Sequence, residues 1–597
     1  MAGHQNRLSR FWQELKRRRV IHVITVYATA SFAIIEVIGN LSEPLNLPTS
    51  LSTIVIIVLA VGFPPAIILS WLYDLTSGTF ERTKPQDETE EEIKPVVVPN
   101  AWKIATYVSF IVIVGLVVLN IASRSSLIKP GMVQSLAILP FDNYTGDENL
   151  EYFVSGMHSS LINDMGKVSG LRVLSETTSK LYKNADKSIP QIASELGVDA
   201  VVEAQVLCIG DTICLQIRVL TAGPEEKQLW IGDYREDKSK ILSLYNRVTK
   251  QIADEVKVEL TPEEERLLSK SRIVDREAYD SYLMGLYFLD DFSEDALNKA
   301  LENLNNAIDK DPDWAPLYAG LAKAWIGIAQ VGFESPSVAY QNVYKNLEKA
   351  ISLDPDLSGA HFISGMSAYL NEWDWSKGER ELLKALAINP NDVMSRIYYA
   401  QLLGILQRPD EAREQGELAI GLDPLNPLIQ ILYSALLLEL DDCQAALTQM
   451  NKVLDVDPGN FIANSVVELA AYRCEDYDKT LDAARIVFTP NFIEEDTFEE
   501  IERIFTVHGF VAAYEDLMSH LEILAQNSPI PPVDMAIRYV YANLPEKAID
   551  WLEKGLEQRD PNMPYIATHG YNLDPLFNNP RFIAICEEMK LPLPKSD

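Results

Sequence analysis

Three stretches of the chain share one spacing of small residues and proline: residues 378–390 read GERELLKALAINP, residues 412–424 read AREQGELAIGLDP, and residues 446–458 read ALTQMNKVLDVDP. Each stretch begins with Gly or Ala, has Ala or Val seven positions later and ends in proline, and successive prolines are 34 residues apart. Small side chains at a fixed phase let two antiparallel helices approach closely, and proline ends the second helix. A period of this length predicts a solenoid of stacked helix pairs.

The pattern continues towards the N-terminus with Asp311-Pro312 and Asp354-Pro355, so that the spacings of the five prolines are 43, 35, 34 and 34 residues. The small residues in phase with them are Ala300, Val343, Gly378, Ala412 and Ala446, and then Ala307, Ala350, Ala385, Ala419 and Val453. These units resemble tetratricopeptide repeats. The resemblance implies a repeat array over 276–490, followed by C-terminal helical repeats and a cap over 491–597.

Two details of the array carry further expectations. The second repeat has nine extra residues within Gln330–Tyr340, which we expect to form a longer loop between its two helices. The end of the chain is expected to cover the last apolar face of the solenoid, because terminal repeats need a polar outer face for solubility.

Residues 132–262 alternate between short β-branched runs and helical spacing, which predicts a small α/β domain. Its sequence includes SLAILPF at 135–141, ENLEYFVSGMHSSLINDM at 148–165 and IASELGVDAVVEAQV at 192–206. The order of these motifs resembles the TolB-like (FlgO-like) domain of bacterial envelope proteins. Related proteins fuse this domain to a winged helix, a class III cyclase or a kinase, and the sequence contains none of those modules. The resemblance therefore implies a fold and an envelope setting but no activity.

Three apolar stretches near the N-terminus, about 20–39, 51–73 and 102–122, have the length of membrane-spanning helices. Together with the basic arm 1–19 they predict a membrane domain over 20–122, and the Lys/Arg bias of the loops places the N-terminus in the cytoplasm. The expected localisation is the bacterial inner (cytoplasmic) membrane, multi-pass, with periplasmic C-terminal domains. The predicted fold class is mostly α, with three transmembrane helices, the α/β domain and the α-solenoid.

Composition and motifs exclude several functions. Lys+Arg 52 against Asp+Glu 86 gives a net charge of −34, which argues against nucleic acid as a partner. The sequence has no nucleophile elbow, no phosphate-binding glycine loop and no metal-ligand spacing of His or Cys. We therefore expect no enzyme activity, no cofactor and no metal.

Cys208 and Cys214 flank Gly210-Asp211, a dipeptide typical of hairpin turns, and are the one candidate disulfide pair. A three-residue loop over 210–212 places the two cysteines opposite each other, whereas a two-residue loop makes them diagonal. The sequence leaves this choice open. Cys443 and Cys474 differ in repeat phase by three residues, so the sequence favours a bond between them less.

A large regular array without chemical sites favours an inner-membrane-anchored periplasmic scaffold or adaptor that binds another envelope protein through its solenoid. The expected partners are proteins of the membrane or periplasm and the lipid bilayer, and self-association is left open. The alternative is a sensory or regulatory membrane protein whose α/β domain binds a small ligand.

Overall fold

The structure is a computed structural model of the chain. It describes residues 133–222, 227–289, 291, 293–489, 493–526 and 530–593, and nearer the N-terminus only residues 27, 29, 31–32, 73–76 and 79–82. The chain divides into two compact units, 1–129 and 130–597. In the first unit, β1 (Tyr73–Thr76) and β2 (Thr79–Arg82) form an antiparallel pair. The account below concerns the second unit.

The membrane part of the prediction is corrected by the structure. None of the helices formed by described residues has the length and apolar character that a bilayer span needs. The predicted spans 20–39, 51–73 and 102–122 lie almost entirely outside the described residues. Hydropathy measures the apolar length of a segment and does not establish that a helix forms over it. The fold class with three transmembrane helices is therefore wrong as stated, and the multi-pass inner-membrane localisation that depended on it is withdrawn.

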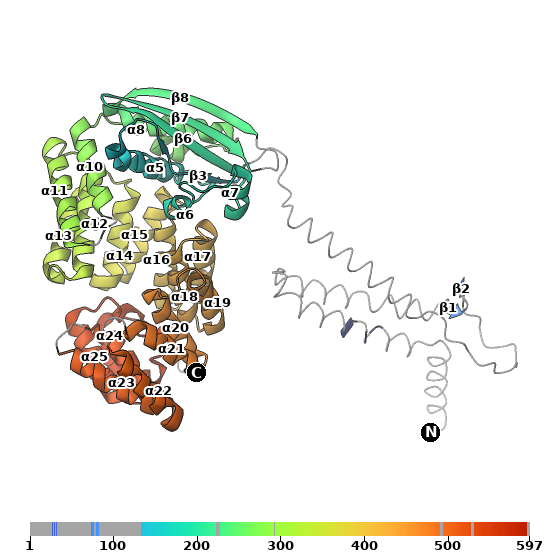
Figure 1. The fold of residues 1–597 in the computed structure, drawn as a ribbon, viewed down its shortest axis with the longest axis vertical. Helices are drawn as coiled ribbons and strands as arrows, with labels where there is room; N and C mark the ends of the chain where they lie inside the picture. The colour runs from blue at the N-terminus through green and yellow to red at the C-terminus, as the bar shows by residue number, and fades with distance from the viewer. Residues whose placement is uncertain are drawn as a thin grey trace, which may run out of the picture. The chain divides into compact units, whose positions relative to one another are not determined.

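The α/β domain contains a six-stranded sheet in the order β5-β3-β6-β7-β8, with β4 beside β6 (Figure 1). Its strands are β3 (Ser135–Ile138), β4 (Asp142–Asn143), β5 (Arg172–Val173), β6 (Ala200–Ile209), β7 (Thr212–Thr221) and β8 (Gln228–Asp237). The pairs of β3 with β5 and β6 are parallel, and β6, β7 and β8 form an antiparallel meander. The strand at one edge of the sheet is therefore β8.

Alternation along the strands decides which face the helices cover. In β7, Ile213, Leu215, Ile217 and Val219 are buried, and the intervening side chains are partly exposed. The buried set packs against α5 (Glu151–Met165) and α8 (Ile241–Glu255). On the opposite face, α7 (Ile189–Leu196) covers the part of the sheet near β3. The meander keeps one partly solvated face, as antiparallel sheets commonly do.

The described residues between 276 and 489 form six helix pairs of the solenoid. They are α10 (Arg276–Phe288) with α11 (Glu294–Lys310), α12 (Ala315–Val331) with α13 (Pro336–Leu353), α14 (Ser358–Ser367) with α15 (Trp375–Ile388), α16 (Val393–Ile405) with α17 (Pro409–Leu422), α18 (Pro427–Glu439) with α19 (Cys443–Leu454), and α20 (Phe461–Arg473) with α21 (Tyr477–Phe488). All ten small residues identified from the repeat phase are buried. The tetratricopeptide-like architecture of this region is confirmed by these pairs.

The turns between successive pairs close the preceding helix in the same way. At the fourth turn the backbone N–H of Asp423 donates to the carbonyl of Ala419 at 3.1 Å, which closes the last turn of α17. Pro424 follows and cannot continue the helix. Asn426 then caps α18 by accepting from the N–H of Leu428. The Asp/Asn-Pro pairs therefore mark an edge of the solenoid where helices end and begin.

The second repeat differs from expectation. Its extra residues do not form a long loop, because α12 extends to Val331 and α13 begins at Pro336, leaving only 332–335 between them. The two helices have 17 and 18 residues, against 13 and 14 in α16 and α17. Added backbone is hydrogen-bonded when it lengthens a helix, so the insertion extends both helices.

The chain ends in α22 (Glu495–His508), α23 (Phe510–Leu524), α24 (Pro532–Tyr541), α25 (Pro545–Gln558) and α26 (Pro580–Met589), with three 3-10 turns between α25 and α26. Leu573, Leu576 and Phe582 in this part are fully buried. They belong to one apolar core with residues of the third to fifth repeats, including Leu402 and Leu436. The end of the chain therefore folds back onto the array.

Candidate interaction surfaces

The first two Asp-Pro turns bind the segment that leads out of the α/β domain. The guanidinium of Arg272 lies 2.6 Å from the carboxylate of Asp311 at the first turn. At the second turn, Lys270 lies 2.8 Å from Asp354, and Arg266 lies 2.8 Å from Asp356. The cations of this segment thus contact the carboxylates of both turns.

The third and fourth turns bind the α/β domain itself. The side-chain oxygen of Asn391 accepts from the N–H of Val173 at 3.0 Å, and its amide donates to the carbonyl of Gly166 at 3.0 Å. At the fourth turn, the carboxylate of Asp423 accepts from the hydroxyls of Ser175 and Thr178. Asp423 is fully buried. The α/β domain and the segment that leads out of it are therefore held on four consecutive turns.

The fifth turn, Asp457-Pro458, has no α/β partner among the described residues; Asp457 accepts a bond from Asn460 beside it. Apolar side chains are exposed here and at the neighbouring start of α18. We call these five residues the turn patch: Leu425, Leu428, Val456, Phe461 and Ile462, with exposed fractions from 38% to 86%. The turn patch was not predicted from the sequence. Leucine, phenylalanine and isoleucine directly after turn residues are a signal of an exposed apolar surface.

The inner face of the fourth to sixth repeats, lined by their first helices, is covered by residues 560–593, here called the C-terminal segment. Its Tyr565 hydroxyl donates to Gln401 of α16 at 3.4 Å, and the amide of Asn572 donates to the carbonyl of Leu469 in α20 at 3.0 Å. Near its end, the carbonyl of Met589 accepts from the indole N–H of Trp375 at 3.1 Å. The segment therefore lies along several repeats instead of after the last one.

Glu439 of α18 is the buried carboxyl group under the C-terminal segment. Its Oε2 has no hydrogen-bond partner among the described residues. A Cβ at Gly404 would lie 2.5 Å from that oxygen, and a Cβ at Gly570 would lie 3.2 Å from Glu439 Cγ. Burial raises the pKa of Glu439 well above its usual range. The two glycines make the space in which this side chain fits.

A cluster of charged side chains joins the C-terminal segment to α20. The guanidinium of Arg473 lies 2.8 Å from Asp574 and 2.6 Å from Asp441. His569 Nδ1 lies 2.6 Å from the other oxygen of Asp574, and this hydrogen bond raises the pKa of His569. The inner face at α20 is therefore an interface within the chain.

The structure places Cys208 opposite Cys214 and Ile209 opposite Ile213, which is the register of the three-residue loop. The two cysteines are paired as a disulfide with their Cα atoms 4.9 Å apart. Both lie on the partly solvated face of the meander, at the end where β6 and β7 meet. The bond ties the hairpin locally, and its formation in the protein stays a prediction.

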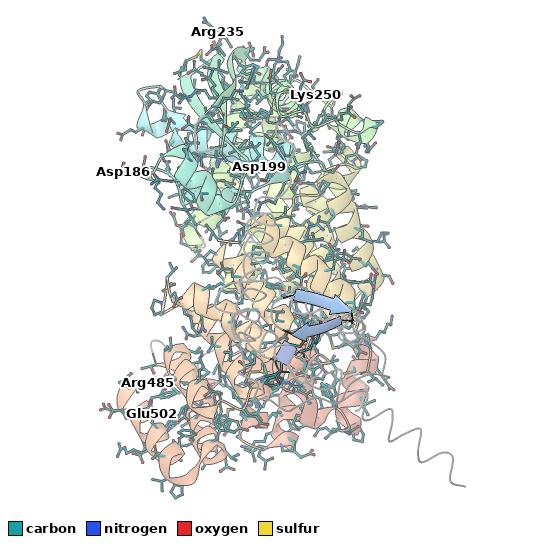
Figure 2. The ribbon with its side chains drawn as sticks, turned by 90° about the vertical axis from the view of Figure 1, so that its right-hand side faces the viewer. Asp186, Asp199, Arg235, Lys250, Arg485 and Glu502 are labelled. Atoms are coloured by element: carbon teal, nitrogen blue, oxygen red, sulfur yellow. A yellow bond between two sulfur atoms is a disulfide. The ribbon has the colours of Figure 1, made fainter. Side chains whose placement is uncertain are left out.

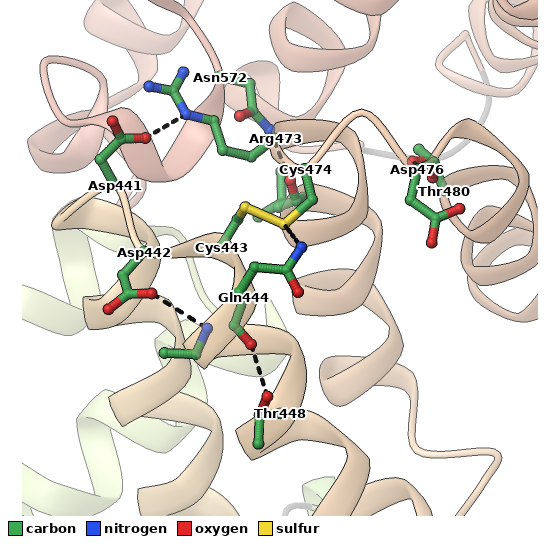
Figure 3. The surroundings of a disulfide bond; sticks show 12 residues. Asp441, Asp442, Cys443, Gln444, Thr448, Arg473, Cys474, Asp476, Thr480 and Asn572 are labelled. Carbon is green, nitrogen blue, oxygen red and sulfur yellow. Dashed lines mark hydrogen bonds and ion pairs between the residues drawn. A yellow bond between two sulfur atoms is a disulfide. The ribbon is translucent and has the colours of Figure 1, made fainter. Parts of the chain in front are cut away.

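Cys443 and Cys474, which the sequence favoured less, are also paired, with Cα atoms 5.8 Å apart (Figure 3). Cys443 begins α19, and Cys474 follows the last residue of α20. These helices are antiparallel neighbours, so the start of one lies beside the end of the other. The repeat phase did not predict this contact. It compares equivalent positions in successive repeats, whereas the contact joins the start of one helix to the end of its antiparallel neighbour.

A charged cleft of about 990 Å³ lies between the β6–β7 turn and the first repeat. Its lining includes Arg276, which is paired with Asp211 at 2.6 Å and with Asp237. Lys310 in the same lining is paired with Glu277 at 2.5 Å. Since these cations are already neutralised, the cleft offers little charge to an anionic ligand.

Comparison with known families gives one match, within the α/β region. Residues 132–231 match the model of the HilA/YgeH-like transcriptional regulator, second domain. The resemblance to the TolB-like (FlgO-like) domain is not confirmed. The match covers one part of the chain and describes that part alone.

A curated relative is the putative adenylate cyclase 3 of Rhizobium meliloti (strain 1021), 33% identical over 189 residues. The matched region is 32% of this chain and 32% of that protein, so the chain spans about a third of its relative's length. This similarity contradicts the expectation that the chain is not an enzyme, which depended on missing motifs and on the resemblance of the α/β domain. The exclusion of enzymes is therefore withdrawn.

Among solved structures, the chain is similar to a thermophilic TPR protein of Thermus thermophilus, with 17% identity, a TM-score of 0.26 and coverage of 35% of this chain and 98% of that one. It is similar to yeast Tom70 with 18% identity, a TM-score of 0.32 and coverage of 53% and 68%. Lipoprotein GNA1162 of Neisseria meningitidis is 20% identical, with a TM-score of 0.17 and coverage of 20% and 99%. At these scores the assignment of the helical repeats depends on the helix pairs described above.

Proposed function

We propose that this chain is a protein-interaction scaffold that binds an apolar, basic segment of a partner protein at the turn patch. The observation that carries the proposal is the exposure of Phe461 and Ile462, 48% and 54%, at the first turn beyond those that hold the α/β domain. Solenoids of this kind offer extended surfaces to other proteins. An exposed apolar cluster rimmed by polar groups is typical of such a site.

The surroundings of the turn patch set the chemistry of the partner. Asp455 and Asp457 are exposed beside it, and the chain as a whole carries a net charge of −34. A partner segment with Lys or Arg next to its apolar side chains would therefore associate faster and be oriented by charge. The inner face does not compete for this role, since the C-terminal segment already covers it along α16 and α20.

The proposal is tested with the full chain and a displayed library of random peptides. Selected peptides should combine apolar residues with Lys or Arg, and Phe461→Asp or Ile462→Asp should weaken their binding at least tenfold. Val507→Asp is the matched control, because Val507 on α22 is 72% exposed and belongs to a different element. Selected peptides that bind Phe461→Asp as well as the parent chain would reject the turn patch as the site.

A regulatory role is the second candidate, favoured by the match of residues 132–231 to a transcriptional regulator's second domain. In that role the α/β domain alters the partner site through the shared row of turns, since Asp423 lies between the domain and Leu425. Loosening the contact by Thr178→Val should then change peptide affinity at the turn patch. An unchanged affinity, with the α/β domain folded, would reject the regulatory role and retain the scaffold role.

A further inference from the structure

The outer edge of β8 is the longest open strand edge in the described part of the chain. The strand has ten residues and ends the order of its sheet, and no described strand pairs with its outer side. Its sequence QLWIGDYRED contains neither lysine nor proline, the residues with which native proteins often protect such edges. An open edge of this length is a template for another strand.

The register shows which backbone groups face outward. Lys238 N–H donates to the carbonyl of Asp211 in the direction of β7, at 2.9 Å. Backbone direction alternates along a strand, so the N–H and C=O groups of the even-numbered residues of β8 point towards β7. The N–H and C=O groups of Ile231, Asp233 and Arg235 point outward. The N–H of Asp237, the next outward residue, is already bonded to the side chain of Glu236. Three consecutive outward residues therefore have backbone groups with no partner among the described residues.

Two of these residues carry opposite charges on the partly solvated face. Asp233 is exposed and accepts from Gln216 at 2.7 Å. Arg235 is exposed, has no ion pair with another described residue, and points away from the body of the unit (Figure 2). A partner strand with the reverse order of charges would pair with both.

We infer that β8 pairs antiparallel with β8 of a second copy of this chain, about a twofold axis at Tyr234. This register places Arg235 of each copy opposite Asp233 of the other, which gives two equivalent ion pairs across the edge. It also brings the outward backbone groups of Asp233 and Arg235 together as hydrogen-bonded pairs. The two sheets then join into one continuous sheet.

The neighbouring registers are less favourable. An axis at Asp233 places two carboxylates opposite each other, and an axis at Arg235 does the same with two guanidinium groups; like charges directly opposite destabilise a pair of strands. An axis at Gly232 places Ile231 opposite Asp233 and forms no ion pair. An axis at Glu236 would place Arg235 opposite Asp237, whose N–H and carboxylate are already bonded to Glu236 and Arg276. The axis at Tyr234 is therefore the most favourable of these registers.

The helix-covered side of β8 is already packed and would not change on pairing. The rings of Trp230 and Tyr234 lie 6.3 Å apart over Gly232, where an added Cβ would lie 2.2 Å from Trp230. The aromatic pair covers the glycine on this side of the strand. The edge is thus prepared for pairing before a second copy arrives, which lowers the ordering cost of association.

Charge reversal in the full chain tests the inference by sedimentation velocity. The parent chain should show a concentration-dependent dimer, and Arg235→Asp or Asp233→Arg alone should weaken it at least tenfold. The double variant Asp233→Arg/Arg235→Asp should restore it, because the pairs are re-formed with their signs exchanged. Lys345→Asp on α13, an exposed cation elsewhere, is the control and should leave the dimer unchanged. The inference is overturned if the parent chain is a monomer at all concentrations, or if neither single charge reversal weakens the dimer.

Cross-linking tests the register independently. In the proposed pairing Tyr234 faces Tyr234 of the second copy as a non-hydrogen-bonded pair, whose Cα atoms lie about 4.5 Å apart. Tyr234→Cys should therefore give a covalent dimer on a non-reducing gel, and Asp233→Cys should not. Cross-linking through position 233 alone would overturn the register. These outcomes are independent of peptide binding at the turn patch.

Discussion

At the scale of single residues, Glu439 is a carboxyl group that the fold buries although water would solvate it better. It carries a carboxyl group in the interior of the unit, with one oxygen unpartnered among the described residues and glycines on two sides. A buried carboxylate without a partner is unstable, so the group is kept neutral by a raised pKa. Its folded state therefore binds a proton that its unfolded state releases near the ordinary Glu pKa of about 4.3.

The sign of the pH dependence follows from this difference. Because the folded pKa is the higher one, the free energy of unfolding falls as pH rises above the ordinary Glu value, until the folded pKa is passed. Glu439→Gln removes this loss and should raise the Tm at pH 8 while changing it little at pH 4. Glu417→Gln on the exposed side of α17 is the control for the lost charge. Equal effects at both pH values would mean that Glu439 is not buried as described.

Cys208 and Cys214 provide a second prediction at this scale. Mass spectrometry of a non-reduced digest should contain a peptide pair joined through them, about two daltons lighter than its reduced form because bond formation removes two hydrogens. The same digest should join Cys443 with Cys474. Free thiols at 208 and 214 would reject the pairing, whereas free thiol at Cys586 is expected because that side chain is buried and unpaired.

At the scale of elements, close helix contacts hold each repeat together. Ala412 in α17 is fully buried, and a Cβ at the equivalent Gly378 in α15 would lie 3.0 Å from Tyr369 Cβ. At such distances the helices have no room for a longer side chain. Both positions were identified from the repeat phase, since contacts between adjacent helices repeat with the sequence period.

Ala412→Leu should overpack this contact and lower the free energy of unfolding by about 1–3 kcal/mol. Denaturant unfolding of the full chain, followed by circular dichroism, measures the change. Glu414→Leu, two positions away on an exposed part of α17, is the matched control and should lie within about 0.5 kcal/mol of the parent. Equal stabilities of the two variants would mean that the repeat phase is wrong.

At the scale of the whole molecule, the four occupied turns make the α/β domain and the solenoid one unit. The bond from Thr178 to Asp423 spans 245 residues and is fully buried at both ends. The fifth turn has the same Asp-Pro pair, and there Asp457 is exposed. The chain therefore contains a matched pair of turns, one inside the interface and one outside it.

Asp423→Ala should lower the free energy of unfolding by about 1.5–3 kcal/mol, because it leaves the buried hydroxyl of Thr178 and the partly buried hydroxyl of Ser175 without their charged acceptor. Hydrogen exchange should also become faster over α6 (Glu176–Lys180), which carries Thr178. Asp457→Ala is the control and should change neither quantity appreciably. If the two variants behave alike, the α/β domain is not held at the fourth turn.

The sequence by itself determined the features that depend on near neighbours along the chain. The phase of Gly378, Ala412 and Ala446 predicts the helix pairs, since each repeat packs mainly on the next and the same contact recurs. The hairpin around Gly210 was predicted for a similar reason, although its loop length was left open, because register depends on contacts that the two strands make elsewhere.

Only the tertiary structure decided the features that join distant segments. The docking of Thr178 on Asp423, the path of Asn572 along α20 and the meeting of Cys443 with Cys474 each occur once and leave no periodic trace in the sequence. Asp423 and Asp457 cannot be told apart from the repeat pattern, because each precedes the proline of its repeat. One is buried and the other exposed because the described α/β domain contacts the fourth turn and not the fifth, a consequence of its size and position that no local pattern encodes.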